Sequence, residues 1–124
     1  MWDGFNQRKF PRIQLKCEVT IHVEKGRKVI NAVTENVGTG GVCIVQSEPL
    51  ERFEAVKVRL EMDGQGSIEC PARICWIIGR KIPGSSKIAA YDTGIEFVGL
   101  SQAKQDQLKH FIEDRIDKGF KVLA

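Results

Sequence analysis

Apolar and polar residues alternate strictly in the segment from Ile13 to Glu24. Every odd position as far as Val23 is apolar, and every even position is polar. A period of two residues is typical of a β-strand that buries one face. Arg12 is in phase with the polar positions, so we expect the strand to begin with Arg12 directed to solvent.

Five further segments have the character of strands and are separated by turn residues. Lys25-Gly26-Arg27 predicts a hairpin that leads into the second strand. The strands that follow are expected at about residues 28–35, 42–45, 56–62, 68–78 and 88–98. Trp76 is in phase with Ile74 and Ile78, which predicts that its ring packs in the core, and the alternative is a platform on which a base stacks.

The last part of the chain changes to helical spacing. Ser101 is suited to an N-cap, and Gly119 is placed to end the helix. The apolar residues between them fall at helical spacing: Leu108, Phe111, Ile112 and Ile116. A helix at about residues 101–118 with one buried face is therefore expected.

Together these elements predict a mainly β protein: a six-stranded antiparallel β-barrel with a C-terminal α-helix. Closing the sheet removes its edges, and the amphipathic helix covers an open face. The length of 124 residues fits one domain. We expect residues 1–12 to be a flexible N-terminal segment, and residues 13–124 to be the barrel domain with its helix.

Composition limits the classes of function. The chain is 42% hydrophobic and 28% charged, as in soluble globular proteins. Its longest apolar run, Ile74–Ile78, is too short to span a membrane, and no secretory signal is visible. A cytoplasmic location without membrane insertion is expected. The net charge of +3 favours a small anion as ligand over DNA or RNA, which require a denser basic stripe.

Catalytic and metal-binding patterns are missing from the sequence. It has no G-x-S-x-G, H-E-x-x-H or phosphate-loop motif, so we expect no enzymatic activity. The four cysteines form no C-x-x-C pair, and neither histidine lies near them with zinc-like spacing. Cys17 and Cys43 fall in apolar strand patterns and are predicted to be small core residues. No metal site, disulfide or cofactor is expected.

A basic segment, Gln7-Arg8-Lys9-Phe10-Pro11-Arg12, precedes the first strand. Pro11 disfavours helix at Phe10, so the chain there is extended. Arg8 and Arg12 then project to the same side, with α-carbons roughly 13–14 Å apart. Such a pair can enclose an anion, and the alternative is a solvated basic tail.

A glycine-rich turn, Asn36-Val37-Gly38-Thr39-Gly40-Gly41, separates two predicted strands. Glycines here permit left-handed backbone or a close approach, and exposed N–H groups can bind an anion. Asn36 offers donors and an acceptor that suit the edge of guanine. An arginine can bind phosphate and stack on a purine face. The two segments together indicate a guanine nucleotide with more than one phosphate contact, whereas a glycine-rich turn alone is most often a simple hairpin.

These motifs resemble those of the PilZ domain family, bacterial receptors for cyclic di-GMP. Arg8-Lys9-Phe10-Pro11-Arg12 resembles the R-x-x-x-R motif of the family, and residues 36–41 resemble its [D/N]-x-S-x-x-G motif. Gly94-Ile95-Glu96-Phe97, before the predicted helix, is similar to the late strand of the family. The resemblance covers about residues 7–116 and implies the PilZ-type split barrel.

The resemblance implies a site and a function. Arg8 and Arg12 would bind phosphates and stack on guanines, Asn36 would contact a guanine edge, and Gly41 would allow close packing of the turn. Gln7 and Lys9 would add polar contacts. The implied protein is a receptor whose arginine segment becomes ordered on cyclic di-GMP and which signals to a partner protein.

One position departs from the family pattern. Gly38 occupies the place of the motif's serine. A serine hydroxyl there would donate to the ligand, so its absence predicts weaker binding. The alternative function is a PilZ-like adaptor that binds proteins and no nucleotide.

Overall fold

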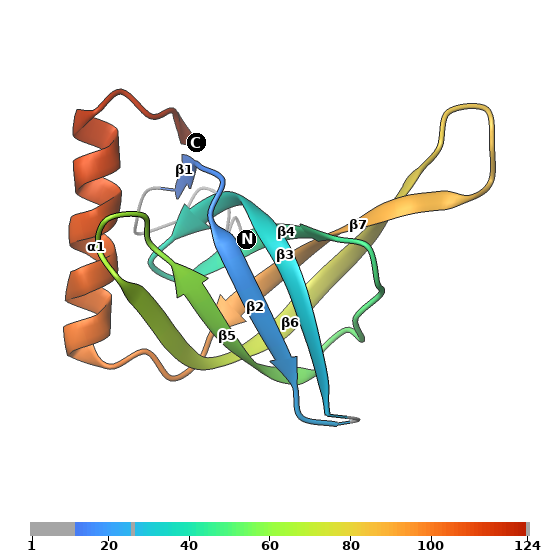
Figure 1. The fold of residues 1–124 in the computed structure, drawn as a ribbon, viewed down its shortest axis with the longest axis horizontal. Coiled ribbons are helices and arrows are strands. Elements are labelled where there is room, and N and C mark those ends of the chain that lie inside the picture. The colour runs from blue at the N-terminus through green and yellow to red at the C-terminus, as the bar shows by residue number, and fades with distance from the viewer. Residues whose placement is uncertain (1–11, 26, 124) are drawn as a thin grey trace, which may run out of the picture.

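The computed structural model describes residues 12–25 and 27–123. Their elements, in chain order, are β1 (Arg12–Gln14), β2 (Glu18–Val23), β3 (Lys28–Gly38), β4 (Gly41–Gln46), β5 (Ala55–Glu61), β6 (Ser67–Lys81), β7 (Ile88–Phe97), α1 (Gln102–Asp117) and β8 (Val122–Leu123). All strand pairs are antiparallel, in the order β2-β5-β6-β7-β4-β3-β1-β8. A further pairing of β2 with β3 closes the six strands β2 to β7 into a barrel (Figure 1). The predicted six-stranded barrel is confirmed.

The single long strand predicted from Ile13 is wrong, because the structure divides it into β1 and β2. Thr34 of β3, whose side chain is fully buried, occupies the break. Its hydroxyl accepts from the amide of Cys17 at 2.8 Å and donates to the carbonyl of Leu15 at 2.7 Å. These bonds satisfy backbone groups that regular strand pairing would otherwise have paired. Both strands therefore stay beside β3 and keep their alternation, and Arg12 is the first residue of β1.

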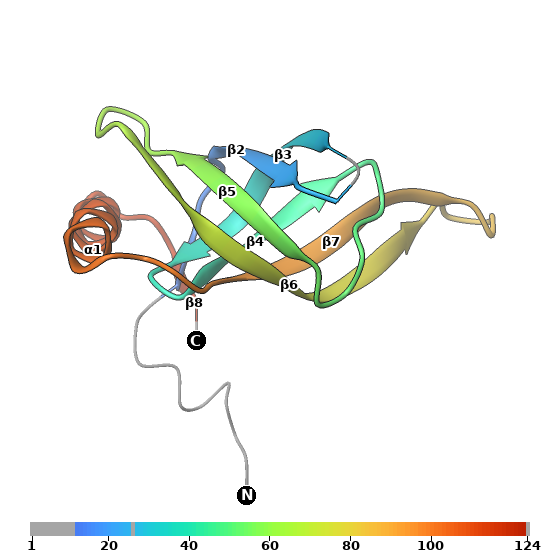
Figure 2. The same ribbon diagram turned by 90° about the horizontal axis from the view of Figure 1, so that it is seen from below.

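Helix α1 covers one end of the barrel (Figures 1 and 2). Leu108, Phe111 and Ile112 are at most 1% exposed and join the barrel core. The Ser101 hydroxyl accepts from the amide of Lys104 at 3.3 Å, which confirms the predicted N-cap. In the described residues, no helix is long and apolar enough to cross a membrane.

The C-terminal end of α1 is closed at Gly119. Its φ is +92°, and its amide donates to the carbonyl of Ile116 at 3.0 Å. The next amide, of Phe120, donates to the carbonyl of Arg115 at 3.0 Å. This pair of bonds is a Schellman motif, which favours glycine at the left-handed position. It confirms that Gly119 ends the helix and turns the chain toward β8.

Strands β6 and β7 extend well beyond the barrel. A β-bulge shifts the register of β6 between Ile74 and Trp76. The extra residue reverses the alternation, so Ile77 packs against the core while Trp76 is 40% exposed. The core position predicted for Trp76 is wrong for this reason. We call residues 76–91 the arm; it projects from the end of the barrel opposite α1 (Figure 1).

Candidate functional site

Arg12 and Asn36 lie on the neighbouring strands β1 and β3. Nη1 of Arg12 donates a hydrogen bond to Oδ1 of Asn36 at 2.7 Å. Val37, between the motif residues of β3, is fully buried, so strand alternation places Asn36 on the outer face of the barrel. Two residues predicted from separate motifs are therefore in contact on one surface.

Gly38 is the residue paired with Arg12 across β1 and β3. It ends β3 and is buried. Arg12 is held from the other side by β8, where its pairing partner is Leu123. The structure thus brings Arg12, Asn36 and Gly38 together, as the resemblance implied.

Gly41 begins β4 and lies against the backbone of β7. A Cβ atom on Gly41 would stand 2.1 Å from the carbonyl oxygen of Ile95, closer than real Cβ contacts allow. The predicted close approach is therefore confirmed at Gly41. The predicted left-handed backbone is not found here, because the glycines with positive φ among the described residues are Gly64, Gly66, Gly84 and Gly119.

Three predicted ligand residues, Gln7, Arg8 and Lys9, lie outside the described residues. Their roles remain predictions that rest on the sequence motif.

Thr39, beside the predicted glycines, was not singled out from sequence. Its hydroxyl is buried and has no hydrogen-bond partner among the described residues. A buried unpaired hydroxyl is costly and uncommon in folded proteins. It marks the turn as a place where a donor and acceptor are available one residue beyond Gly38.

Trp76 is a second residue that sequence analysis did not place in the site. Strand register connects it to the motif in one row, because Asn36 pairs with Cys43, Cys43 with Gly94, and Gly94 with Trp76. The indole lies directly over Gly94, where a Cβ atom would stand 2.2 Å from Nε1 of Trp76. Three strand spacings separate Trp76 from Asn36, or about 14 Å. A glycine opposite a tryptophan was the available sequence signal, but it depends on a register that only the fold reveals.

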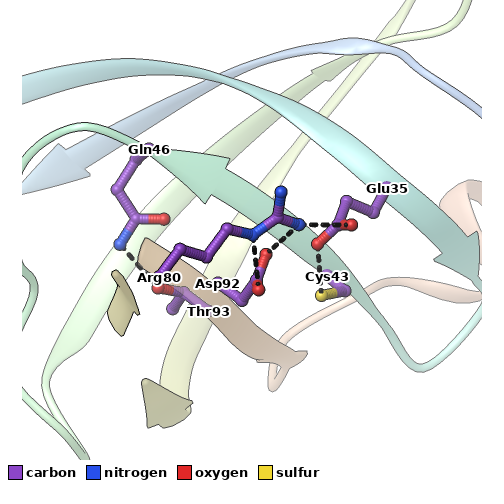
Figure 3. A network of polar contacts seen from close by, with 6 residues as sticks. All are labelled: Glu35, Cys43, Gln46, Arg80, Asp92 and Thr93. Carbon is purple, nitrogen blue, oxygen red and sulfur yellow. Dashed lines mark hydrogen bonds and ion pairs between the residues drawn. The ribbon is translucent and has the colours of Figure 1, made fainter. Parts of the chain in front are cut away.

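The outer face beside this row carries an ionic network (Figure 3). Arg80 of the arm bonds both carboxylate oxygens of Asp92, from Nε at 2.8 Å and from Nη2 at 2.7 Å. The same Nη2 reaches Glu35 of β3 at 2.8 Å. The thiol of Cys43 donates to the other Glu35 oxygen at 3.7 Å. Arg80 thereby ties the base of the arm to the strand that carries Asn36.

Charge and burial shift the pKa values of this network. A hydrogen bond with Asp92 raises the pKa of Glu35, burial adds to the effect, and Arg80 opposes it. The hydrogen bond from Arg80 lowers the pKa of Asp92. Burial, and then the charges of Glu35 and Asp92, raise the pKa of Cys43 to about 12. Cys43 is therefore a protonated thiol at neutral pH and not a nucleophile.

Comparison with known proteins identifies the family. The family model of the PilZ domain matches residues 6–114, which include both motifs. The chain belongs to the PilZ domain family. A comparison with curated protein sequences finds no match.

Solved structures show the same PilZ fold at low sequence identity. The PilZ domain of YcgR from Escherichia coli with c-di-GMP has a TM-score of 0.72 and 16% identity. The match covers 90% of this chain and 92% of that domain. The K. pneumonia MrkH-c-di-GMP complex has a TM-score of 0.75 and 17% identity over 90% of this chain. The Bacillus subtilis inhibitor of motility MotI/DgrA has a TM-score of 0.73 and 19% identity over 90% of this chain. This chain spans about half of the latter two proteins, 52% and 53%.

Proposed function

We propose that this PilZ domain is a receptor for cyclic di-GMP, bound on the outer face of the barrel where β1, β3 and β4 meet. The contact between Arg12 and Asn36 carries this proposal, because it unites the two motifs whose pairing indicates a guanine nucleotide. The similar YcgR and MrkH structures hold c-di-GMP, which supports the choice of ligand.

In the proposed complex, Arg12 and Arg8 bind phosphate oxygens and stack on guanine, since a guanidinium does both. Asn36 exchanges its bond with Arg12 for contacts to a guanine edge. Gly41 keeps the turn close to β7 and the surface flat. Gln7 and Lys9 add polar contacts from the segment before β1.

Trp76 extends the site along the outer face of the sheet. Trp76 is 40% exposed, and its indole lies directly over Gly94, in the row that begins at Asn36. A fixed, half-exposed indole is a stacking platform for a base. We place a second guanine contact here, at the far end of the row from Asn36.

Gly38 weakens this site relative to a serine-containing motif. A hydrogen bond to a charged group contributes about 1.5–3 kcal/mol, and Gly38 supplies no hydroxyl. The unpaired hydroxyl of Thr39 offers a replacement if the turn shifts when ligand binds. We therefore propose weaker binding, not its loss.

The proposed receptor acts through a change of order and not through catalysis. The segment before β1, which carries Arg8, folds over the ligand and, with it, forms a surface for a downstream protein. Amide hydrogen exchange with and without cyclic di-GMP tests this step. Protection of the segment before β1 only in the complex supports it, and equal exchange in both states contradicts it.

A competition assay tests the choice of ligand. Unlabelled cyclic di-GMP should displace a fluorescent analogue, whereas single-stranded oligonucleotides should not. Trp76→Leu, which keeps an apolar side chain without a stacking face, should weaken the binding of the analogue. Failure of cyclic di-GMP to bind would contradict the receptor function and favour the alternative, a protein-binding adaptor in which Gly38 has removed nucleotide binding.

A further inference from the structure

The arm is a two-stranded hairpin that extends past the ends of the neighbouring strands β4 and β5. The pairing of β5 with β6 ends at Ala55 and Arg73, and that of β4 with β7 ends at Gln46 and Tyr91. Ile74 makes two further backbone hydrogen bonds, to Phe53 and Glu54. From Trp76 to the tip, the strand partner of β6 among the described residues is β7. Every residue from 78 to 89 is exposed, and the tip is the far end of the molecule along its longest axis (Figure 1).

The charge of this hairpin has one sign. From Trp76 to Tyr91 the chain has three cations, namely Arg80, Lys81 and Lys87, and no carboxylate. Arg80, at the base of the arm, is engaged in ion pairs with Asp92 and Glu35. The two lysines lie nearer the tip, so the positive charge that faces outward is at the end of the arm.

Apolar side chains accompany the lysines. Ile78, Ile82 and Ile88 are 60%, 43% and 47% exposed. Lys81 pairs with Ile88 across the hairpin, and the amide of Ile82 donates to the carbonyl of Lys87 at 2.9 Å. Each lysine thus lies directly across the hairpin from an isoleucine. The connecting residues 83–86 are uncharged.

This arrangement selects among the surfaces that could cover the arm. Two arms side by side would repel each other, because both are positive and neither has a carboxylate. Duplex nucleic acid requires a denser basic stripe than two lysines. The surface of an anionic lipid bilayer has negative headgroups outside and apolar acyl chains beneath. It can therefore bind lysines and neighbouring isoleucines at the same time. A projecting tip can also reach a flat surface without obstruction by the barrel.

We propose that the arm docks this domain on the surface of an anionic lipid bilayer. Ile82 and Ile88 enter the boundary between headgroups and acyl chains, and Lys81 and Lys87 remain among the anionic headgroups. The tip rests on the bilayer and does not cross it. The Arg80 bonds to Glu35 and Asp92 fix the direction of the arm relative to the barrel. The proposal is independent of nucleotide binding.

Co-sedimentation with vesicles tests the proposal in the absence of nucleotide. The whole chain should bind vesicles that contain phosphatidylglycerol and should not bind vesicles of phosphatidylcholine alone. The arm variant is Ile82→Ser with Lys87→Gln. It should bind at least about fivefold more weakly, because one cation near an anionic surface contributes about that factor.

The matched control is Val29→Ser with Lys25→Gln at the β2–β3 turn. It removes one exposed aliphatic side chain and one exposed lysine, and Val29 is 54% exposed. Circular dichroism checks that both variants fold. Loss of binding in the arm variant but not in the control supports the proposal. It is overturned if the wild-type chain ignores anionic vesicles, if both variants lose binding equally, or if the arm binds an oligonucleotide or a protein and no vesicle.

Discussion

The guanidinium of Arg12 donates to the side-chain oxygen of Asn36 at 2.7 Å, across β1 and β3. The two residues are 24 positions apart in the sequence. The bond orients Asn36 and places a cation beside Gly38, which pairs with Arg12. We therefore expect a phosphate that binds Arg12 to change the surroundings of Asn36 as well.

Replacing Arg12 should reduce the affinity for cyclic di-GMP. Arg12→Ala removes a charged donor, and such bonds contribute about 1.5–3 kcal/mol, so we expect about 10- to 150-fold weaker binding. Arg59→Ala is the control, because Arg59 is an exposed arginine on β5, paired with Glu61. Fluorescence anisotropy with a labelled nucleotide measures both. Equal affinity of the two variants would exclude Arg12 from the site.

Restoring a hydroxyl at position 38 should strengthen binding. Gly38→Ser offers a new donor beside Arg12, and we expect a gain of about tenfold or more. Because Gly38 is buried, the melting temperature of the variant is measured first. A folded variant with unchanged affinity would show that the missing serine does not limit binding.

The glycines of the turn should differ in how much stability they provide. A methyl group on Gly41 meets the Ile95 carbonyl at 2.1 Å, whereas one on Gly40 meets nothing within 4 Å. We expect Gly41→Ala to lower the free energy of unfolding by about 1–3 kcal/mol or more. Gly40→Ala should leave it nearly unchanged. Urea denaturation compares the pair, and equal stability would mean that β4 can move away from β7 at no cost.

The Arg80 network should make stability depend on pH. Because Arg80 lowers the pKa of Asp92, Asp92 contributes stability above its ordinary pKa and loses it as the pH falls. Glu35 has the opposite sign: its raised pKa favours folding at low pH, and this contribution is lost as the pH rises. Arg80→Met leaves two ionised carboxylates in proximity, so it should destabilise the fold at neutral pH and much less when both are protonated.

Thermal melts of the wild-type chain and of Arg80→Met, from neutral pH down to the pH at which Glu35 and Asp92 are protonated, measure this loss of stability. Arg59→Met is the matched control, because Arg59 and Arg80 have equally exposed side chains, both 47%, and both are ion-paired. Within residues 12–25 and 27–123, Glu61 is the carboxylate bonded to Arg59 and no second one joins it, so this pair should show a smaller pH dependence. A pH-independent cost for Arg80→Met would contradict the coupling of Glu35 and Asp92.

Alternation in the sequence was sufficient to locate the barrel strands, because each buries one face. It failed where a distant side chain or an inserted residue intervened. Thr34 divides the first strand by bonding at Leu15 and Cys17, which lie 19 and 17 positions away. The bulge before Trp76 reverses which side chains of β6 face the core, and the two-residue alternation of the sequence gives no sign of such an insertion.

The candidate site divides in the same way. Arg12, Asn36 and Gly38 were predictable because each belongs to a short motif, and motifs are local. Trp76 joins them only through three successive strand registers. The bond between Glu35 and Arg80 spans 45 positions and depends on a long β6 strand. No local pattern encodes such contacts.

Isothermal titration calorimetry of the wild-type chain with cyclic di-GMP tests the central claim most directly. The account predicts a saturable heat with a defined stoichiometry, and a marked loss of affinity in Arg12→Ala. An absence of heat at high ligand concentration, with no chemical shift change in amides of Asn36 to Gly41, would contradict it.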